Sequence, residues 1–96
     1  MIQSFGDKIS EDIWNGENTT AARKIPQRLW DAAARKLDMI NAAVNLEALK
    51  VPPGNRLEKL RGSLHEYYSI RVNDQYRITF RWNNGIANNV RIADYH

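Results

Sequence analysis

The stretch Tyr76-Arg77-Ile78-Thr79-Phe80-Arg81-Trp82 alternates apolar residues with polar or cationic ones. This period of two is typical of a β-strand with one buried and one exposed face. Three further strands are predicted at residues 56–61, 66–72 and 86–95. The connections between these four strands are short and contain Gly, Asn or Asp, so we expect a consecutive antiparallel meander.

The residues before this sheet predict a short first strand at residues 1–5 and two helices. In the first helix Ile9 and Ile13 share a face, and Asn15-Gly16 is a stop signal. The second helix is expected to begin at Pro26, because an apolar stripe follows at spacings of three to four. That stripe is Ile25, Leu29, Ala33, Leu37, Ile40 and Val44. Residues 45–54, with Pro52-Pro53-Gly54, predict a loop.

Together these elements predict an α+β fold, in which two N-terminal helices pack on one face of a small, twisted, mainly antiparallel sheet of four to five strands. The length of 96 residues predicts a single domain over residues 1–96. Strand parity directs one set of side chains toward the helices, namely Tyr68, Ile70, Val72, Tyr76, Ile78, Phe80 and Trp82. The opposite, open face is expected to carry Arg71, Arg77, Thr79 and Arg81.

The amino-acid composition limits the kinds of functional site that the chain can form. The chain has no cysteine and two histidines, which excludes disulfides and thiolate metal sites, so we expect metal-independent chemistry and no cofactor. It has neither a basic, apolar leader nor 18 consecutive apolar residues, and we expect a soluble, cytoplasmic protein with no membrane contact.

Positive charge is concentrated in the second half of the chain. Residues 1–50 hold seven Lys or Arg and seven Asp or Glu, whereas residues 51–96 hold seven and four. Six of the latter seven cations are arginines, whose planar fork of donors suits phosphate. This bias favours a polyanion such as nucleic acid as a partner, although exposed arginines paired with carboxylates would give the same composition.

Several segments, taken in order, resemble the HigB branch of the RelE/ParE superfamily, the toxins of type II toxin–antitoxin modules. They are Ile2-Gln3-Ser4-Phe5, Arg35-Lys36-Leu37-Asp38, residues 52–62 from Pro52-Pro53-Gly54 to Arg61-Gly62, Tyr68-Ser69-Ile70, residues 74–80 and Asp94-Tyr95-His96. The resemblance implies a RelE-like fold and a ribosome-dependent endoribonuclease that cleaves messenger RNA. It also implies a HigA-type helix-turn-helix antitoxin as partner, with operator DNA bound only through that antitoxin.

Metal-free RNA cleavage needs a base for the 2′-OH, a cation for the phosphate and an acid for the leaving oxygen. Carried over from the family, the acid or base is His96, with Asp94 and Tyr95 beside it, and the cation is Arg77. Lys59 and Arg61 are expected to hold the RNA backbone, together with Arg71, Arg81 and Arg91 on the sheet.

Glu58 departs from some relatives, which carry an active-site histidine at this position. A glutamate there can act as a general base, or it can pair with Lys59 or Arg61. Two alternatives stay open for the other site residues: a solvated terminal His96, and an Arg77 paired with Glu66 or Asp74. The alternative function is a catalytically weak module that binds the antitoxin and co-represses the operator. Gyrase poisoning, the ParE activity, is disfavoured by the terminal Asp-Tyr-His.

Overall fold

The computed structural model describes residues 1–62 and 66–94, which form an α+β fold with a four-stranded antiparallel sheet. The helices are α1 (Lys8–Trp14) and α2 (Trp30–Ala42), and the strands are β1 (Glu58–Lys59), β2 (Tyr67–Arg71), β3 (Tyr76–Asn83) and β4 (Ile86–Asp94). The strand order is β1-β2-β3-β4, so the predicted meander is confirmed. No helix within these ranges is long and apolar enough to cross a membrane.

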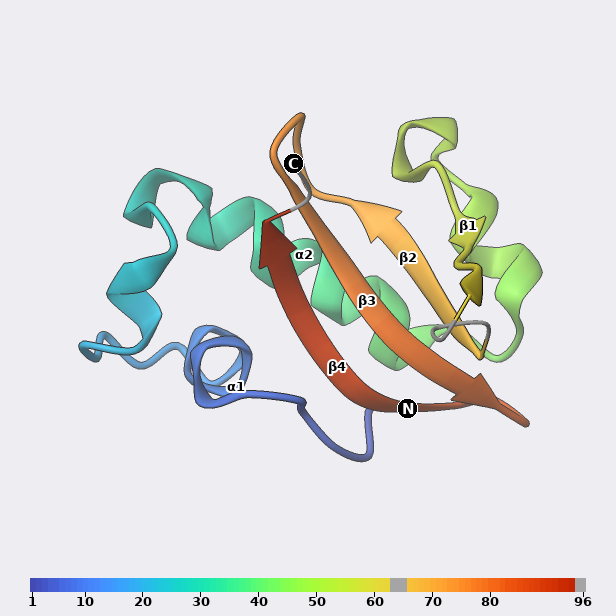
Figure 1. Ribbon diagram of the computed structural model, residues 1–96, viewed down its shortest axis with the longest axis horizontal. Helices are drawn as coiled ribbons and strands as arrows, with labels where there is room; N and C mark the ends of the chain where they lie inside the picture. The colour runs from blue at the N-terminus through green and yellow to red at the C-terminus, as the bar shows by residue number, and fades with distance from the viewer. Residues whose placement is uncertain (63–65, 95–96) are drawn as a thin grey trace.

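The helices cover one face of the sheet. In both views α2 lies behind β2 and β3, and Figure 1 shows α1 beside β4. The core fills the space between these layers, because α2 and the strands direct their apolar sides toward it. Its fully buried side chains include Leu37 and Ile40 of α2, and Ile70, Ile78, Phe80 and Val90 of the sheet.

The helix boundaries have local causes. Asp7 caps α1 by accepting the Ser10 N–H at 2.9 Å, and Gly16, at φ 73°, follows its end as predicted. The predicted start of α2 at Pro26 is wrong, because residues 27–29 form a 3-10 turn and the α-helix begins at Trp30. Val44 is also misassigned to the buried stripe. It is 79% exposed, since α2 ends at Ala42.

Both hairpin turns follow from their residue types. Asn84 and Gly85 connect β3 to β4 at φ 50° and 81°, the positive pair that a tight two-residue hairpin requires. Between β2 and β3, the Asn73 side chain accepts the N–H groups of Gln75 and Tyr76 at 3.0 and 2.7 Å.

β4 contains a bulge that the sequence pattern did not reveal. Thr79 pairs with Arg91, but Arg81 pairs with Asn88, so β4 holds one extra residue against two steps of β3. Asn89 accommodates the extra residue by adopting the left-handed conformation, with a φ of 53°. The side-chain alternation therefore shifts within β4, and Ala87 and Val90 are both buried.

The predicted first strand is reduced to two isolated bridges. Ile2 pairs with Ala87 and Phe5 with Val90, both in the parallel sense. The intervening Ser4 hydroxyl accepts the Asn89 N–H at 3.0 Å and donates to Asn88 Oδ1 at 3.1 Å. The N-terminal segment thus joins β4 at its bulge.

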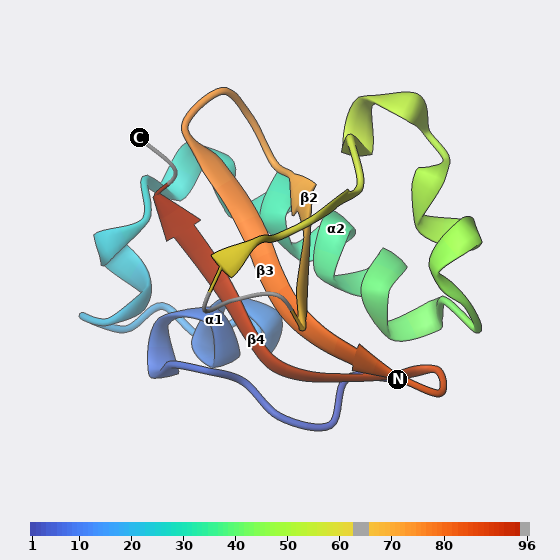
Figure 2. The same ribbon diagram turned by 45° about the vertical axis from the view of Figure 1, so that its right-hand side comes forward.

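β1 is shorter than predicted and lies over the sheet. Residues 53–55 form a 3-10 turn, η4, and Arg56 follows in the left-handed region at φ 46°, so regular pairing begins only at Glu58. Figure 2 shows β1 in front of β2 and β3, on the side away from α2. The sheet therefore curls, and its edge strand covers part of the open face.

Candidate active site

Arg77 occupies the centre of the candidate site. It is the second residue of β3 and pairs in register with Arg71 and Ala93, on the face opposite the helices. Parity predicted an outward side chain, yet Arg77 is only 8% exposed. The reason is tertiary: the η4–β1 segment lies over this part of the sheet and contacts the guanidinium.

Ser69 and the Arg56 carbonyl hold that guanidinium in place. Arg77 Nε donates to Ser69 Oγ at 2.9 Å, and Nη2 donates to the Arg56 carbonyl at 2.6 Å and to the Ser69 carbonyl at 3.4 Å. Ser69 itself is fully buried in β2. A buried cation is tolerated when its donors are satisfied, so these contacts compensate the burial of Arg77 and restrict its rotamers.

Glu58 lies beside this cation. Its Oε2 is 3.7 Å from Arg77 Nη2, and its side chain is 55% exposed. β1 provides this proximity, because Glu58 pairs in register with Ser69, the residue that binds Arg77. The expected pairing of Glu58 with Lys59 or Arg61 is therefore replaced by an ion pair with Arg77. The site therefore places the solvent-accessible Glu58 carboxylate directly beside the immobilised Arg77 guanidinium.

A buried amide anchors the segment that covers Arg77. Asn55 is fully buried and donates to the Leu49 and Val51 carbonyls at 3.2 and 3.3 Å. Its oxygen accepts from the Lys36 amine on α2. Burial lowers the pKa of Lys36, and the neighbouring Arg35 and Arg71 lower that pKa further. Asn55 thus ties η4 to α2 and positions the Arg56 carbonyl.

β4 ends next to the Arg77 site. Asp94 pairs in register with Tyr76, the neighbour of Arg77. Its carboxylate is exposed and accepts from Gln75 Nε2 at 3.0 Å. Tyr95 and His96, expected as catalytic residues, lie outside the described residues, as does His65.

Three of the other predicted phosphate-binding arginines have carboxylate neighbours. Arg81 Nη2 is 2.7 Å from Glu66, Arg71 pairs with Asp74, and Arg91 Nε is 3.5 Å from Asp7. Glu66 and Asp74, the alternative partners considered for Arg77, each contact a different arginine. These partly or fully exposed pairs are individually weak, and they leave each arginine able to exchange a carboxylate for a phosphate.

Lys59 and Arg61 flank the site along the edge of the sheet. Both are exposed, and with Glu58, Leu60 and Gly62 they line a shallow hollow on β1 and the residues after it. Leu60 is buried and donates its N–H to the Tyr67 carbonyl at 2.8 Å, which holds this edge against β2. The two cations thus border Glu58, and their expected contact with an RNA backbone stays a prediction.

The arrangement can bind an anion and accept a proton at adjacent points. Arg77 supplies a fixed cation, and the Glu58 carboxylate can act as a base within reach of a group bound there. Among residues 1–62 and 66–94, no cluster of three or more His, Cys, Asp or Glu side chains could hold a metal ion.

Three contributors to this site escaped sequence reasoning: Ser69, Asn55 and the Arg56 carbonyl. The serine at position 69, between Tyr68 and Ile70, was one available signal, because a serine hydroxyl on a strand face can accept a hydrogen bond from an arginine on the neighbouring strand. The asparagine after Pro52-Pro53-Gly54 was another, since asparagine side chains commonly bind the backbone of turns. No local pattern points to a carbonyl.

The fold is that of the RelE-like toxins. It is similar to a chain of the YoeB–YefM complex from Staphylococcus aureus, with a TM-score of 0.61 and 14% identity over 100% of this chain and 98% of that chain. It is also similar to a mutant of YafQ from E. coli, with a TM-score of 0.59 and 16% identity over 98% and 91% of the two chains. At these identities the likeness concerns the fold alone.

The sequence identifies the branch. The family model for the RelE-like toxin HigB of type II toxin–antitoxin systems matches residues 3–96. Toxin HigB-1 of Vibrio cholerae is 43% identical over 89 residues, which cover 93% of this chain and 92% of that protein. The chain therefore belongs to the HigB-like toxin family, as the segments quoted above indicated.

Proposed function

We propose that this toxin is a ribosome-dependent endoribonuclease, which cleaves messenger RNA by metal-independent acid–base chemistry and so inhibits translation. The observation that carries the proposal is the pair formed by Arg77 and Glu58, 3.7 Å apart on the open face. Membership of the HigB-like family supports the substrate class. A single-domain protein of residues 1–96 acting in the cytoplasm is part of this proposal.

Each residue has a step in this reaction. Glu58 accepts the proton of the 2′-OH as its oxygen attacks the adjacent phosphorus. Arg77 stabilises the negative charge that develops on the phosphoryl oxygens, and its contacts with Ser69 and the Arg56 carbonyl keep it preorganised for this. The 5′-oxygen leaves as an alcohol once it is protonated, and a 2′,3′-cyclic phosphate remains.

His96 is assigned the role of that acid, with Asp94 and Tyr95 in support, by resemblance to the family. The end of β4 next to Arg77 is consistent with this assignment, because Asp94 pairs with Tyr76. Lys59, Arg61, Arg71, Arg81 and Arg91 are the proposed contacts to the RNA backbone.

The test is transcript cleavage on purified ribosomes. Arg77→Lys retains the charge but loses the planar fork, and His96→Ala removes the imidazole; each should reduce cleavage by about 100-fold or more. Lys24→Ala, on the exposed 3-10 turn η1 (Ala22–Lys24), is the matched control and should cleave normally. A wild-type chain that never cleaves ribosome-bound transcript would contradict the proposal.

A second candidate is a catalytically weak partner that acts with its antitoxin on operator DNA. The same Glu58–Arg77 ion pair favours it, because a carboxylate at 3.7 Å partly neutralises the cation that a phosphate would need. Glu58→Gln separates the candidates. If Glu58 is the base, the substitution reduces cleavage by about 100-fold; if Glu58 masks Arg77, cleavage increases.

The proposed protein partner is a HigA-type helix-turn-helix antitoxin, through which alone the toxin would contact operator DNA. The YoeB relative from S. aureus was solved as a complex with YefM, which supports an antitoxin of some kind. Co-expression with the adjacent reading frame should abolish growth arrest and yield a complex in gel filtration. Persistent arrest, with no complex, would argue against that partner.

A further inference from the structure

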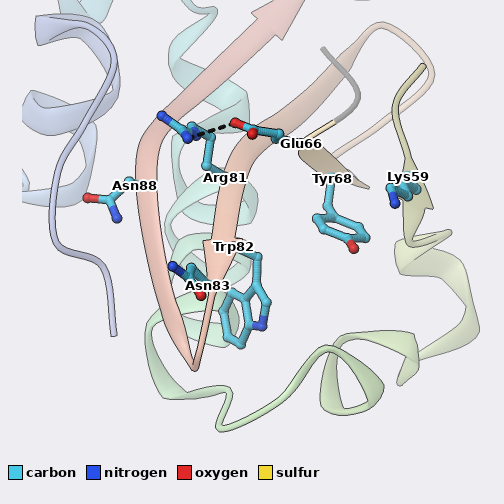
Figure 3. A pocket seen from close by; sticks show the side chains of 7 residues that line it. All are labelled: Lys59, Glu66, Tyr68, Arg81, Trp82, Asn83 and Asn88. Carbon is cyan, nitrogen blue, oxygen red and sulfur yellow. Dashed lines mark hydrogen bonds and ion pairs between the residues drawn. The ribbon is translucent and has the colours of Figure 1, made fainter. Parts of the chain in front are cut away.

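A second hollow, of about 460 Å³, lies at the end of the sheet where β2 begins. Its lining side chains come from β1, β2, β3 and β4 and from Glu66, the residue before β2 (Figure 3). Those that matter here are Lys59 of β1, Glu66, Tyr68 of β2, and Arg81, Trp82 and Asn83 of β3. This hollow is separate from the Arg77 site, since Arg81 is four residues along β3 from Arg77, about 13 Å.

The hollow exists because β3 extends beyond β2. The register of these strands ends with Tyr67 opposite Arg81, whereas β3 continues to Asn83. Side chains from both faces of the sheet therefore reach one space. Arg81 comes from the open face, and Trp82 comes from the face that packs on the helices.

The aromatic wall is rigid. Phe80 is fully buried and contacts both rings of the hollow, stacking on Tyr68 at 6.3 Å between centroids and meeting Trp82 edge-on at 6.2 Å. Tyr68 and Trp82 are only partly buried. Two partly exposed rings anchored by a third form a preorganised platform, on which a planar base can stack with little loss of side-chain entropy.

The polar wall complements a nucleotide. Lys59 is an exposed cation, and Glu66 holds the Arg81 guanidinium at 2.7 Å. Asn83 adds an amide with both a donor and an acceptor, the pair needed to bind the edge of a base. With two cations and one carboxylate the lining is net positive. Rings, amide and cations together match a base linked to a phosphate better than an apolar peptide side chain.

We propose that this hollow binds one nucleotide of a single-stranded RNA, with its base on Tyr68 and Trp82 and its phosphate against Lys59. That this nucleotide flanks the cleaved bond of a messenger RNA rests on the proposed function. β1 links the two sites, because Glu58 faces Arg77 and the next residue, Lys59, lines the hollow. The hollow would then influence which sequence is presented to Arg77.

Binding can be measured without cleavage. The four nucleoside monophosphates and a 2′-O-methyl trinucleotide, which cannot be cleaved, are titrated into isotope-labelled protein and followed by NMR. We expect saturable shifts of the Trp82 indole N–H and the Tyr68 ring. The indole of Trp30, which donates to the Ile25 carbonyl at 2.9 Å, should not move.

Variants then test the lining. Lys59→Ala should increase Kd by about tenfold, as expected for one lost phosphate contact. Lys50→Ala, an exposed lysine on the 3-10 turn η3 (Leu46–Lys50), is the matched control and should leave Kd unchanged. Trp82→Phe keeps a ring against Phe80, which protects the fold, and should weaken binding several-fold. Arg77→Ala should still show the saturable shift of the Trp82 indole N–H on mononucleotide addition.

Absence of saturable shifts at Trp82, or an unchanged Kd in Lys59→Ala, would overturn the proposal. So would variants that lose antitoxin binding while nucleotide binding persists, since the hollow would then belong to the protein partner. Failure of the proposed function is distinguishable: the titration would succeed while wild-type protein left ribosome-bound transcript uncut.

Discussion

At the scale of single residues, the site depends on how one arginine is buried. Arg77 is 8% exposed, and its Nε is satisfied by the hydroxyl of Ser69, which is itself inaccessible. A guanidinium held in this way does not have to reorganise when a phosphate acquires charge, and this is the advantage of a preorganised cation. Ser69 is therefore a positioning residue, which acts on the reaction through Arg77.

Replacing Ser69 with alanine should reduce kcat by about 10- to 100-fold, because one hydrogen bond to a charged group is worth roughly 1.5–3 kcal/mol. KM should change less. The Arg77 Nε–H signal should shift in NMR spectra, a change that a general loss of packing would not confine to that signal. Ser69→Thr keeps the hydroxyl and should restore most of the rate. Full activity in Ser69→Ala with an unmoved Nε–H signal would refute this role.

At the scale of elements, two irregular segments shape the sheet. The bulge in β4 lets the N-terminal segment join at Ser4 and keeps both Ala87 and Val90 in the core. The η4–β1 segment, tied to α2 through Asn55, brings Glu58 over Arg77. Each segment includes a non-glycine residue at positive φ, namely Asn89 and Arg56. Such residues persist only where the surrounding contacts hold them.

The bulge can be tested at Asn89. Valine is β-branched and should destabilise the left-handed conformation by about 1–2 kcal/mol, whereas glycine adopts it without strain. Asn89 Nδ2 also donates to the Tyr67 hydroxyl at 3.2 Å, and both substitutions lose that contact equally. The urea midpoint of unfolding should therefore be higher for Asn89→Gly than for Asn89→Val. Equal midpoints would contradict the strain at this position.

The end of α1 is linked to the following loop by a buried carboxylate. Asp12 is 1% exposed and accepts from Thr19 Oγ1 at 2.6 Å and from Lys8 Nζ at 3.0 Å. The Thr19 hydrogen bond, followed by that of Lys8, holds the pKa of Asp12 below its ordinary value of 3.8. The carboxylate therefore stabilises the fold while it is ionised.

The pH dependence of stability follows from this direction. The contribution of Asp12 is present above pH 3.8, the ordinary value, and is lost as the pH falls through the lower pKa of the folded protein. Asp12→Asn should thus flatten the loss of unfolding free energy below about pH 4. The exposed Asp38→Asn on α2 is the control, and its urea midpoints should keep the wild-type pH dependence. An unaltered acid slope in Asp12→Asn would exclude this linkage.

At the scale of the whole molecule, the two faces of the sheet have different tasks. One face buries the core against α2, and the other carries the arginines. The edge at β1 connects the Arg77 site to the hollow at Tyr68 and Trp82. An RNA strand that followed this edge would meet Glu58, Lys59 and Arg61 in turn, so the proposed contacts extend well beyond the cleaved bond.

Binding of single-stranded RNA should weaken steeply with salt. Each neutralised phosphate contributes about 0.7 to the slope of log K against log salt concentration. Arg61→Ala should reduce the slope by about that amount. Lys24→Ala, on the helical side of the molecule, should leave it unchanged. Fluorescence anisotropy over a salt series measures both, and equal slopes in the two variants would remove Arg61 from the RNA path.

Much of the fold followed from local patterns. The alternation in β3, the positive-φ pair at Asn84-Gly85 and the stripe of α2 each depend on residues close in sequence. The sequence by itself therefore determined β3, its hairpin with β4, the meander and the helix-covered face. It also determined that Arg77 lies on the open face, because the parity of β3 alone fixes that side of the sheet.

Only the tertiary structure decided what surrounds that cation. Glu58 and Ser69 meet Arg77 because the sheet curls and η4 is anchored to α2, and both depend on contacts between residues distant in the chain. Neither the curl of the sheet nor the bulge at Asn89 produces a periodic pattern of residues that could be recognised in the sequence. A strand pattern records which face a side chain occupies, whereas burial, partners and distance depend on the segments that pack over that face.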